Sequence, residues 1–208
     1  MTQDTILVMG IGNLLWADEG FGVRAVEELQ RRYVLPDHVT VVDGGTQGIY
    51  LLPFVQQAKR MLVLDAVDFH HAPGTLITAR DDEIPSYYGF NKLSLHQANF
   101  QELLSLAKLS GQFPDATALI GVQPQDISDY GGSLTPVVRG ALDAAVSMAK
   151  WVLRGWGVAV EQRLAPWVPA GRDCLALGAY ESGRPAAAEA WRHGDARVLN
   201  SALAAETA

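Results

Sequence analysis

The chain has too little positive charge for a nucleic-acid-binding protein. Its 208 residues include 16 Lys and Arg against 23 Asp and Glu, so the formal net charge is 16 − 23 = −7. Binding to phosphate backbones depends on clustered basic residues that release counterions, and this sequence contains no such run. We therefore expect no nucleic-acid partner.

Cysteine is almost absent. The single cysteine, Cys174, excludes a disulfide framework, which needs at least two, and also excludes zinc ribbons and cysteine-rich clusters. It lies outside any recognisable nucleophile motif. We therefore interpret Cys174 as a small packed hydrophobic residue.

Long uncharged hydrophobic runs are also missing. The longest apolar tract, residues 135–160, is interrupted by four charged residues, Arg139, Asp143, Lys150 and Arg154. A membrane-spanning helix needs about 20 predominantly apolar residues. The short apolar run at 6–9 has no basic segment before it, unlike a secretory signal. We expect a cytoplasmic protein with no membrane partner.

Three common catalytic signatures do not occur. The sequence has no G-x-S-x-G nucleophile elbow, no H-E-x-x-H zinc motif and no G-x-x-x-x-G-K-[ST] phosphate loop. Any enzymatic activity must therefore be built from residues that are distant in sequence.

The first 160 residues alternate between β-rich runs and helical patterns, which is typical of an α/β protein with a mainly parallel sheet. We expect the strand at 75–79 to pair near the third strand, with an antiparallel direction as one option. Residues 81–91 lack periodicity and predict a loop. Strands are predicted at 5–9, 39–42, 61–64, 75–79 and 118–122, and helices at 20–33, 49–57, from 94 onward and at 135–154.

Composition changes near residue 161, where proline and glycine become frequent and an alanine-rich stretch follows at 186–205. The sequence shows no internal repeat. We therefore predict one main domain at 1–160 and a partly irregular C-terminal tail at 161–208.

The first strand leads into Gly10-Ile11-Gly12-Asn13, a glycine turn of the kind that often binds ligands in α/β folds. A dinucleotide fingerprint would need glycine where Leu15 stands. The carboxylates of Asp18 and Glu19 would also oppose a phosphate at the following helix start. The alternative is that Gly10 and Gly12 serve turn geometry alone.

Three acidic residues follow or end the first three predicted strands: Glu19, Asp43 and Asp65. The carboxyl ends of parallel strands share one edge of the sheet, where ligands bind in open α/β folds. Carboxylates that gather there would repel one another unless they share a cation or a proton. Local capping is the alternative for Asp43, and for Asp18 near a helix start. Capping is a weaker explanation for Asp65, which ends an apolar run.

His96 begins the helix predicted from Ser94, and with Glu19 and Asp65 it would complete a set of two oxygen ligands and one nitrogen ligand. Three protein ligands suit a catalytic or substrate-bridging metal rather than a closed structural site. A surface or satisfied core histidine is the alternative, because spacing alone does not show convergence. We expect His70 and His71, in a predicted turn, to be solvated.

The sequence resembles the [NiFe]-hydrogenase maturation endopeptidases, which remove a C-terminal peptide from the hydrogenase large-subunit precursor. The resemblance spans about residues 5–155, and the tail resembles members that serve membrane-bound uptake hydrogenases. The matching segments are GIGNLLWADEGFGVR at 10–24, VVDGGTQG at 41–48, LVLDAVD at 62–68, PGTL at 73–76, KLSLHQ at 92–97, LIGVQP at 119–124 and DYGGSLTP at 129–136.

The resemblance implies a three-layer α/β/α sandwich with a twisted, mainly parallel five-stranded sheet. It implies that Glu19, Asp65 and His96 are the metal-binding and catalytic residues. It also implies that the substrate cleft is formed by the D-G-G-T turn, which comprises Asp43, Gly44, Gly45 and Thr46.

The family likeness further implies that the metal is nickel supplied by the substrate, with other divalent ions as substitutes. The implied partner is the large-subunit precursor, and the free protein is expected to be a monomer. Hydrolysis would use either metal polarisation of the carbonyl or water, or a carboxylate of Glu19 or Asp65 as general base. The sequence does not separate the two.

Two other functions are consistent with parts of the pattern. A nickel-dependent hydrogenase chaperone would use the same three ligands without cutting. A peptidyl-tRNA hydrolase-like enzyme shares the G-x-G-N turn, but it would carry Pro-Gly in place of Leu14-Leu15 and a basic surface. Trp16 and the aromatics of the 81–91 segment, Tyr87, Tyr88 and Phe90, are either partner anchors or a cover for the core.

Overall fold

The computed structural model describes residues 4–84, 95–167 and 176–183, with the backbone alone for 95–99. Contacts divide the chain into a unit at Met1–Arg172 and a unit at Asp173–Ala208. The described part of the second unit contains α7 (Leu177–Ser182), a helix of 6 residues. The predicted roles of Cys174, Tyr87, Tyr88 and Phe90 lie outside the described residues.

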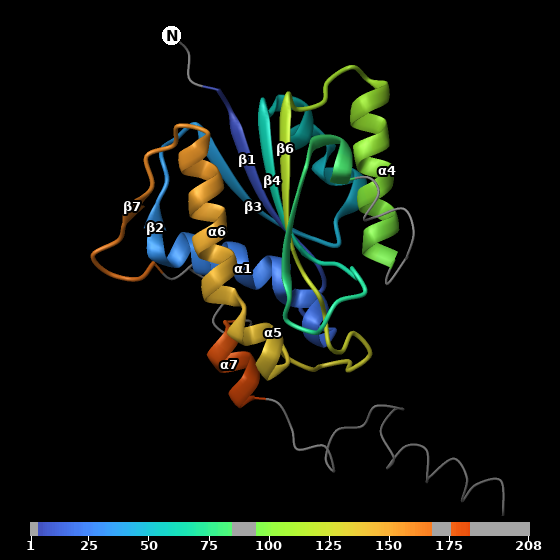
Figure 1. Ribbon diagram of the computed structural model, residues 1–208, viewed down its shortest axis with the longest axis vertical. Helices are drawn as coiled ribbons and strands as arrows, with labels where there is room; N and C mark the ends of the chain where they lie inside the picture. The colour runs from blue at the N-terminus through green and yellow to red at the C-terminus, as the bar shows by residue number, and fades with distance from the viewer. Residues whose placement is uncertain (1–3, 85–94, 168–175, 184–208) are drawn as a thin grey trace, which may run out of the picture. The chain divides into compact units, whose positions relative to one another are not determined.

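Five strands form the central sheet of the first unit. Their order is β3 (Val39–Gly45), β1 (Ile6–Ile11), β4 (Arg60–Ala66), β6 (Ala116–Val122) and β5 (Leu76–Arg80) (Figure 1). The first four run parallel, and β5 is antiparallel to β6. The strand predicted at 75–79 therefore exists and is antiparallel, the option that the sequence left open, and it lies one strand away from β4 because its partner is β6.

The strand sequences are apolar on both faces because both faces are covered. Every residue of β1 is buried, with Ile6 and Val8 in one core cluster and Leu7 and Met9 in the other. Near-continuous hydrophobic runs are the expected signature of such doubly covered parallel strands.

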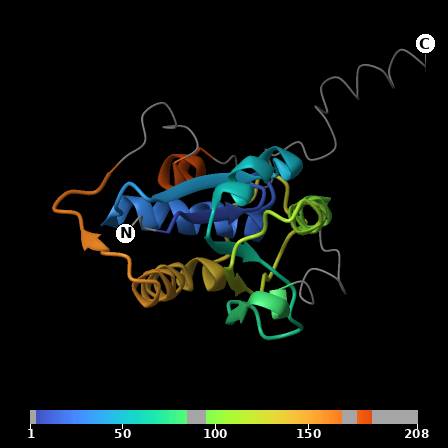
Figure 2. The same cartoon turned by 90° about the horizontal axis from the view of Figure 1, so that it is seen from above.

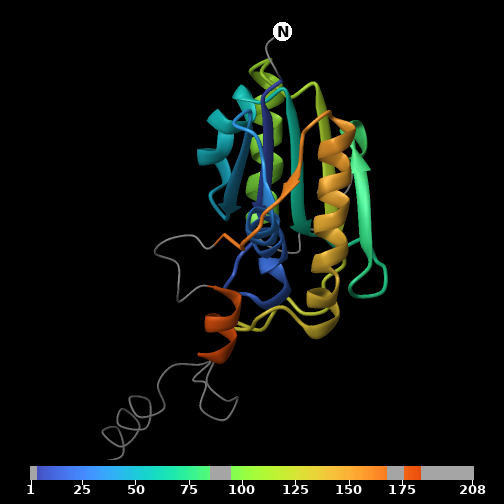
Figure 3. The same ribbon diagram turned by 90° about the vertical axis from the view of Figure 1, so that its left-hand side faces the viewer.

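Helices form a layer on each face. The first face is covered by α1 (Phe21–Arg32) and α6 (Leu142–Gly155). The other is covered by η2 (Gly48–Leu51), α2 (Leu52–Gln57) and α4 (Leu95–Leu109). Figures 2 and 3 show α2 and α6 on opposite sides of the strands. The three-layer α/β/α sandwich predicted from the sequence is confirmed.

The helix predicted at 135–154 is divided into α5 (Pro136–Gly140) and α6. Pro136 occupies the first turn of α5, as predicted. The Ala141 N–H donates to the Val138 carbonyl, a tighter bond than the α-helical one. Gly140 favours the break because glycine is a poor residue for a helix interior.

Short elements complete the first unit. β2 (Tyr33–Val34) pairs with β7 (Glu161–Gln162), so this unit extends past the boundary at 160 predicted from composition. The start of the predicted 81–91 loop instead forms η3 (Asp81–Glu83), and the remainder from 85 lies outside the described residues. Across the described ranges, no helix is both long and apolar enough to cross a bilayer.

Candidate active site

The candidate site lies where β3, β1 and β4 end. Gly10 of β1 is level with Asp43 of β3 on one side and with Leu64 of β4 on the other. Asp65 follows Leu64 directly, and the loop after β1 leads to Glu19. The three acidic residues therefore share the carboxyl edge of adjacent parallel strands, as predicted.

The strand order reverses at this edge. Within the central sheet, β1 is followed in the chain by β3 on one side of it and then by β4 on the other.

 The helices after these strands cover opposite faces of the sheet, with α1 on one and α2 on the other. Such a reversal creates the crevice in which open α/β proteins bind their ligands. In this chain it falls between β1 and β4, the strands that lead to Glu19 and contain Asp65.

Glycines allow the chain after β1 to turn back onto the sheet. A side chain at Gly12, whose φ is +135°, would stand 1.8 Å from the Glu19 carbonyl oxygen. A side chain at Gly22 would stand 2.1 Å from the Leu64 carbonyl oxygen. These glycines therefore serve close backbone approach as well as turn geometry, and they hold η1 (Ala17–Gly20) against the sheet edge.

Both candidate carboxylate residues are withdrawn from solvent. Asp65 is fully buried, and its Oδ1 accepts a hydrogen bond of 2.7 Å from the Ala66 N–H. Glu19 is buried within η1, where its N–H donates to the Trp16 carbonyl at 2.9 Å. Oxygen donors in a buried position bind a hard or borderline divalent cation well, so the chemistry of this pair fits such an ion.

The D-G-G-T turn lies beside the glycine turn of β1. The Gly12 N–H donates to the Gly45 carbonyl at 3.0 Å, and Gly45 itself has a φ of +46°. A side chain at Gly44 would meet the Ile11 side chain at 2.7 Å. Thr46 at the end of the turn is exposed and Asp43 is half-buried. The contribution of this turn to a substrate cleft stays a prediction.

His96 lies in the first turn of α4, as the sequence predicted, but its side chain is outside the described set. Among the residues whose side chains are described, no group of three or more His, Cys, Asp or Glu is arranged to hold a metal. The structure therefore places Glu19 and Asp65 at one edge, while the convergence of His96 with them stays a prediction.

Asp18 does not act as the local cap that its position near a helix start suggested. Its fully buried carboxylate accepts hydrogen bonds from residues far along the chain. The donors are the N–H groups of Gln125 (2.8 Å), Asp126 (2.9 Å) and Thr135 (2.7 Å) and the Thr135 hydroxyl (3.0 Å). The sequence gives little sign of this role because most of the donors are backbone groups.

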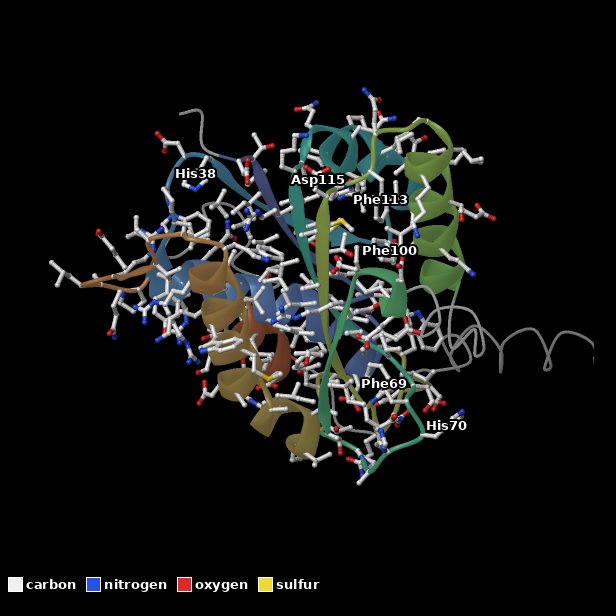
Figure 4. All side chains as sticks on the ribbon, turned by 45° about the horizontal axis from the view of Figure 1, so that its top comes forward. His38, Phe69, His70, Phe100, Phe113 and Asp115 are labelled. Atoms are coloured by element: carbon white, nitrogen blue, oxygen red, sulfur yellow. The ribbon has the colours of Figure 1, made fainter. Side chains whose placement is uncertain are left out.

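Gln123 organises the segment after β4 in a similar way. Its buried side chain accepts from the Phe69 N–H at 2.7 Å and donates to Asp68 Oδ1 at 3.0 Å. Burial alone would raise the pKa of Asp68, but hydrogen bonds from the His70 N–H and Gln123, with the nearby His70 ring, lower it overall. Figure 4 shows Phe69 and His70 on this segment.

The side chains of His70 and His71 are exposed, as predicted. Nδ1 of His70 is 3.5 Å from Asp68 Oδ1. The solvated interpretation of the two histidines is therefore confirmed.

Trp16, three residues before Glu19, contacts Tyr130 edge to face, with ring centroids 5.2 Å apart and an interplanar angle of 61°. Both rings are partly open to solvent. The Gly131 N–H donates to the Leu15 carbonyl at 2.7 Å. The Trp16 ring therefore lies between a neighbouring ring and solvent, and its role as a partner anchor stays a prediction.

An open, mainly parallel sheet with buried carboxylates at its strand-order reversal is the arrangement of an α/β enzyme. Comparison with known proteins narrows this class. Residues 23–150 match the profile of the family described as Hydrogenase maturation protease. The chain is 49% identical over 199 residues to the hydrogenase expression/formation protein HupD of Rhodobacter capsulatus, covering 96% of this chain and 95% of that protein.

Other relatives agree. The chain is 53% identical over 205 residues to HoxM of Azotobacter vinelandii, covering 96% of each protein. The solved structure of the hydrogenase maturating endopeptidase HybD from E. coli is 39% identical and superposes with a TM-score of 0.72, covering 76% of this chain and 97% of that one. The chain therefore belongs to the hydrogenase maturation protease family.

Family membership confirms the resemblance found in the sequence, and it makes the chain a peptide-bond hydrolase of hydrogenase maturation. The matches to HupD and HoxM include most of the C-terminal tail, since they cover 96% of the chain. The HybD structure instead covers 76% of the chain.

Proposed function

We propose that this chain removes the C-terminal peptide from the nickel-containing large-subunit precursor of a [NiFe] hydrogenase, in the cytoplasm and as a monomer. In this proposal Glu19, Asp65 and His96 contact nickel that the precursor already holds. The observation that carries the proposal is the position of Glu19 and Asp65 on either side of the strand-order reversal, together with family membership.

The proposed ligands suit a metal that arrives with the substrate. Two carboxylates and one imidazole would add hard and borderline donors to an ion already bound by the precursor. Such an incomplete ligand set makes cleavage conditional on the metal, because a precursor without nickel would lack a main anchor. The ion, once bound, supplies charge stabilisation at the scissile carbonyl or an activated water.

The residues of this chain position the peptide and the proton. In one version, the Glu19 or Asp65 carboxylate takes a proton from the attacking water as general base. In the other, both carboxylates act only as ligands. The D-G-G-T turn, Asp43 to Thr46, would hold the extended peptide beside Gly12, because it already contacts the β1 turn through Gly45.

The direct test is the mass of the precursor before and after incubation with this protein, with and without nickel. We expect the precursor to lose its C-terminal peptide only when both this protein and nickel are present. An unchanged mass with stable complex formation would support a nickel-dependent chaperone instead. Repeating the incubation with zinc or cadmium asks whether other divalent ions substitute.

Two conservative variants separate docking from chemistry. Asp65→Asn and His96→Gln keep side-chain size while changing charge or ligand strength. We expect both to lower cleavage at least about 100-fold. If a variant binds the nickel-loaded precursor with unchanged affinity but does not cut, that residue acts in the chemical step. If affinity falls in parallel, it acts as a ligand.

A further inference from the structure

The most unusual buried group of the site region is the Asp18 carboxylate, which the proposed chemistry does not use. It is fully buried and precedes Glu19 directly. A buried carboxylate is costly unless several hydrogen bonds satisfy it, and an apolar residue in its place would leave those hydrogen-bond donors without an acceptor. The presence of a carboxyl group here therefore points to a requirement beyond packing.

The hydrogen bonds show which segment the Asp18 side chain holds in place. The connection between β6 and α5, residues 123–135, would otherwise run across the surface without regular structure. Asp18 binds it at both ends, at Gln125 and Asp126 on one side and at Thr135 on the other. The Asp18 N–H also donates to the Asp126 carbonyl at 3.0 Å.

The element that carries Glu19 is weak by itself. η1 has only four residues, and its N-cap residue, Trp16, makes no capping hydrogen bond through its side chain. Ala17 has a φ of +41°, a left-handed conformation that is unfavourable for a residue other than glycine. The local chain therefore needs an external constraint to keep this conformation.

We propose that Asp18 is the positioning residue of the site: it fixes η1 so that the Glu19 carboxylate faces the carboxyl edge of β4, and it does not touch metal or substrate. The same hydrogen bonds hold Tyr130 against Trp16 beside Glu19. This inference rests on the proposed role of Glu19.

Asp18→Asn is the informative substitution. Asn has the same shape, and its oxygen can replace Oδ2, which accepts three of the four hydrogen bonds. Its NH2 group would then face the Thr135 N–H, a donor opposite a donor, where Oδ1 now accepts. We expect η1 to shift while the fold is kept.

The control is a variant that loses stability elsewhere. Leu153 and Val146 are buried in α6. Truncating either to alanine lowers Tm through a cavity without touching η1. Leu153→Ala and Val146→Ala differ in the volume removed, so they provide two different losses of Tm against which Asp18→Asn is compared.

Three measurements on the full chain test the proposed role of Asp18. We expect kcat for precursor cleavage to fall at least about tenfold in Asp18→Asn relative to both controls, with KM within about threefold. We expect the Kd for Zn²⁺ alone to rise about tenfold. The indole N–H resonance of Trp16, identified with Trp16→Phe, should shift in Asp18→Asn and stay in place in both controls.

A kcat, Zn²⁺ affinity and Trp16 resonance equal to those of the control would overturn the proposal and leave Asp18 a purely structural residue. If Asp18→Asn does not fold, Thr135→Val decides, because it removes only the hydroxyl donor and keeps the backbone bond. We expect a shifted Trp16 resonance and a kcat lowered about threefold; unchanged values overturn the proposal. If the unaltered protein does not cleave the precursor, the proposed function fails, while the Trp16 and Zn²⁺ readouts still decide the role of Asp18.

Discussion

Single residues near the site are constrained mainly by how closely backbones approach. Gly12 and Gly22 bring η1 and α1 within contact of the ends of β1 and β4, which no larger residue would allow. The fully buried carboxylates of Asp18 and Asp65 lie in the same region. The position of Glu19 is thus set in part by Gly12 and Gly22, which have no chemical function of their own.

Gly12→Ala tests this packing. Its methyl group would overlap the Glu19 carbonyl, and its φ of +135° is strained for alanine. We expect the stability to fall by about 2–4 kcal/mol and cleavage to be lost. Gly140→Ala is the matched control: no atom stands within 4 Å of its added methyl, so thermal unfolding and cleavage should match the unaltered protein. Normal activity of Gly12→Ala would contradict the account.

Asp68 gives a pH-dependent contribution to stability. Its pKa in the folded protein is below the ordinary value of 3.8, so the folded state favours the ionised form. The contribution is therefore present above pH 3.8 and is lost as the pH falls through the lower folded value. We expect Asp68→Asn to cost about 1 kcal/mol at pH 7.

Denaturant unfolding from pH 7 to pH 2.5 measures this difference. The gap between the two proteins should narrow as the pH falls below 3.8, the ordinary pKa, where the Asp68 carboxylate becomes protonated first in the unfolded chain and then in the folded protein. A gap that is constant over the whole range would show that Asp68 contributes by packing rather than by charge.

At the residue scale, the sequence predicts those features of the site that depend on the type of a residue and on its place after a strand. Glu19 and Asp65 could be predicted to share an edge because each follows a recognisable strand. The role of Asp18 could not be predicted, because its donors are mostly backbone N–H groups more than 100 residues away. The role of Gln123 could not be predicted either, because its partners at 68–71 are far away in the chain and two of them are backbone N–H groups.

At the scale of elements, periodicity predicts the interior helices and strands well and their ends less well. The apolar residues of α4 that recur at helical spacing are all buried: Phe100, Leu103, Leu104 and Ala107. The sequence predicts the strand at 75–79 but not its partner, because β6, which lies 36 residues later, inserts between β4 and β5. Tertiary pairing of this kind leaves no local signal.

One charged cluster joins two helices. Glu28 of α1 accepts hydrogen bonds from Arg31 and Arg32, and Arg32 also contacts Asp143 of α6. Burial alone would raise the pKa of Glu28, but the two arginines lower it overall. The cluster therefore favours the folded state above the ordinary pKa of Glu28, 4.5, and loses this effect as the pH falls through the lower folded value.

Glu28→Gln should lower the stability by about 1 kcal/mol at pH 7, since it removes one member of a network rather than an isolated pair. Asp115→Asn is the control, because its pair with Lys59 is exposed on both sides and separated by 3.4 Å. Thermal unfolding should show a lower Tm for Glu28→Gln and an unchanged Tm for Asp115→Asn. Equal shifts in the two variants would refute the distinction.

At the scale of the whole molecule, the first unit contains both hydrophobic clusters and every element of the central sheet. We therefore expect a chain truncated after Arg172 to unfold cooperatively with a Tm within about 5 °C of the full chain. Circular dichroism during heating measures this. A truncated chain without a cooperative transition would show that the second unit is required for folding.

Cleavage by the truncated chain is a separate question. Relatives named HupD and HoxM share the tail, whereas the HybD structure matches 76% of the chain. Full cleavage of the precursor after truncation would show that the tail is dispensable for the chemistry.

The central claim is that two carboxylates and one imidazole, distant in sequence, bind one divalent ion at the end of β4. A crystal structure of the protein soaked in Zn²⁺ tests it most directly. We predict one ion bound by oxygens of Glu19 and Asp65 and by a ring nitrogen of His96, each at about 2.0–2.2 Å. A structure in which the His96 ring lies outside the ligand sphere of an ion held by Glu19 and Asp65 would contradict the claim.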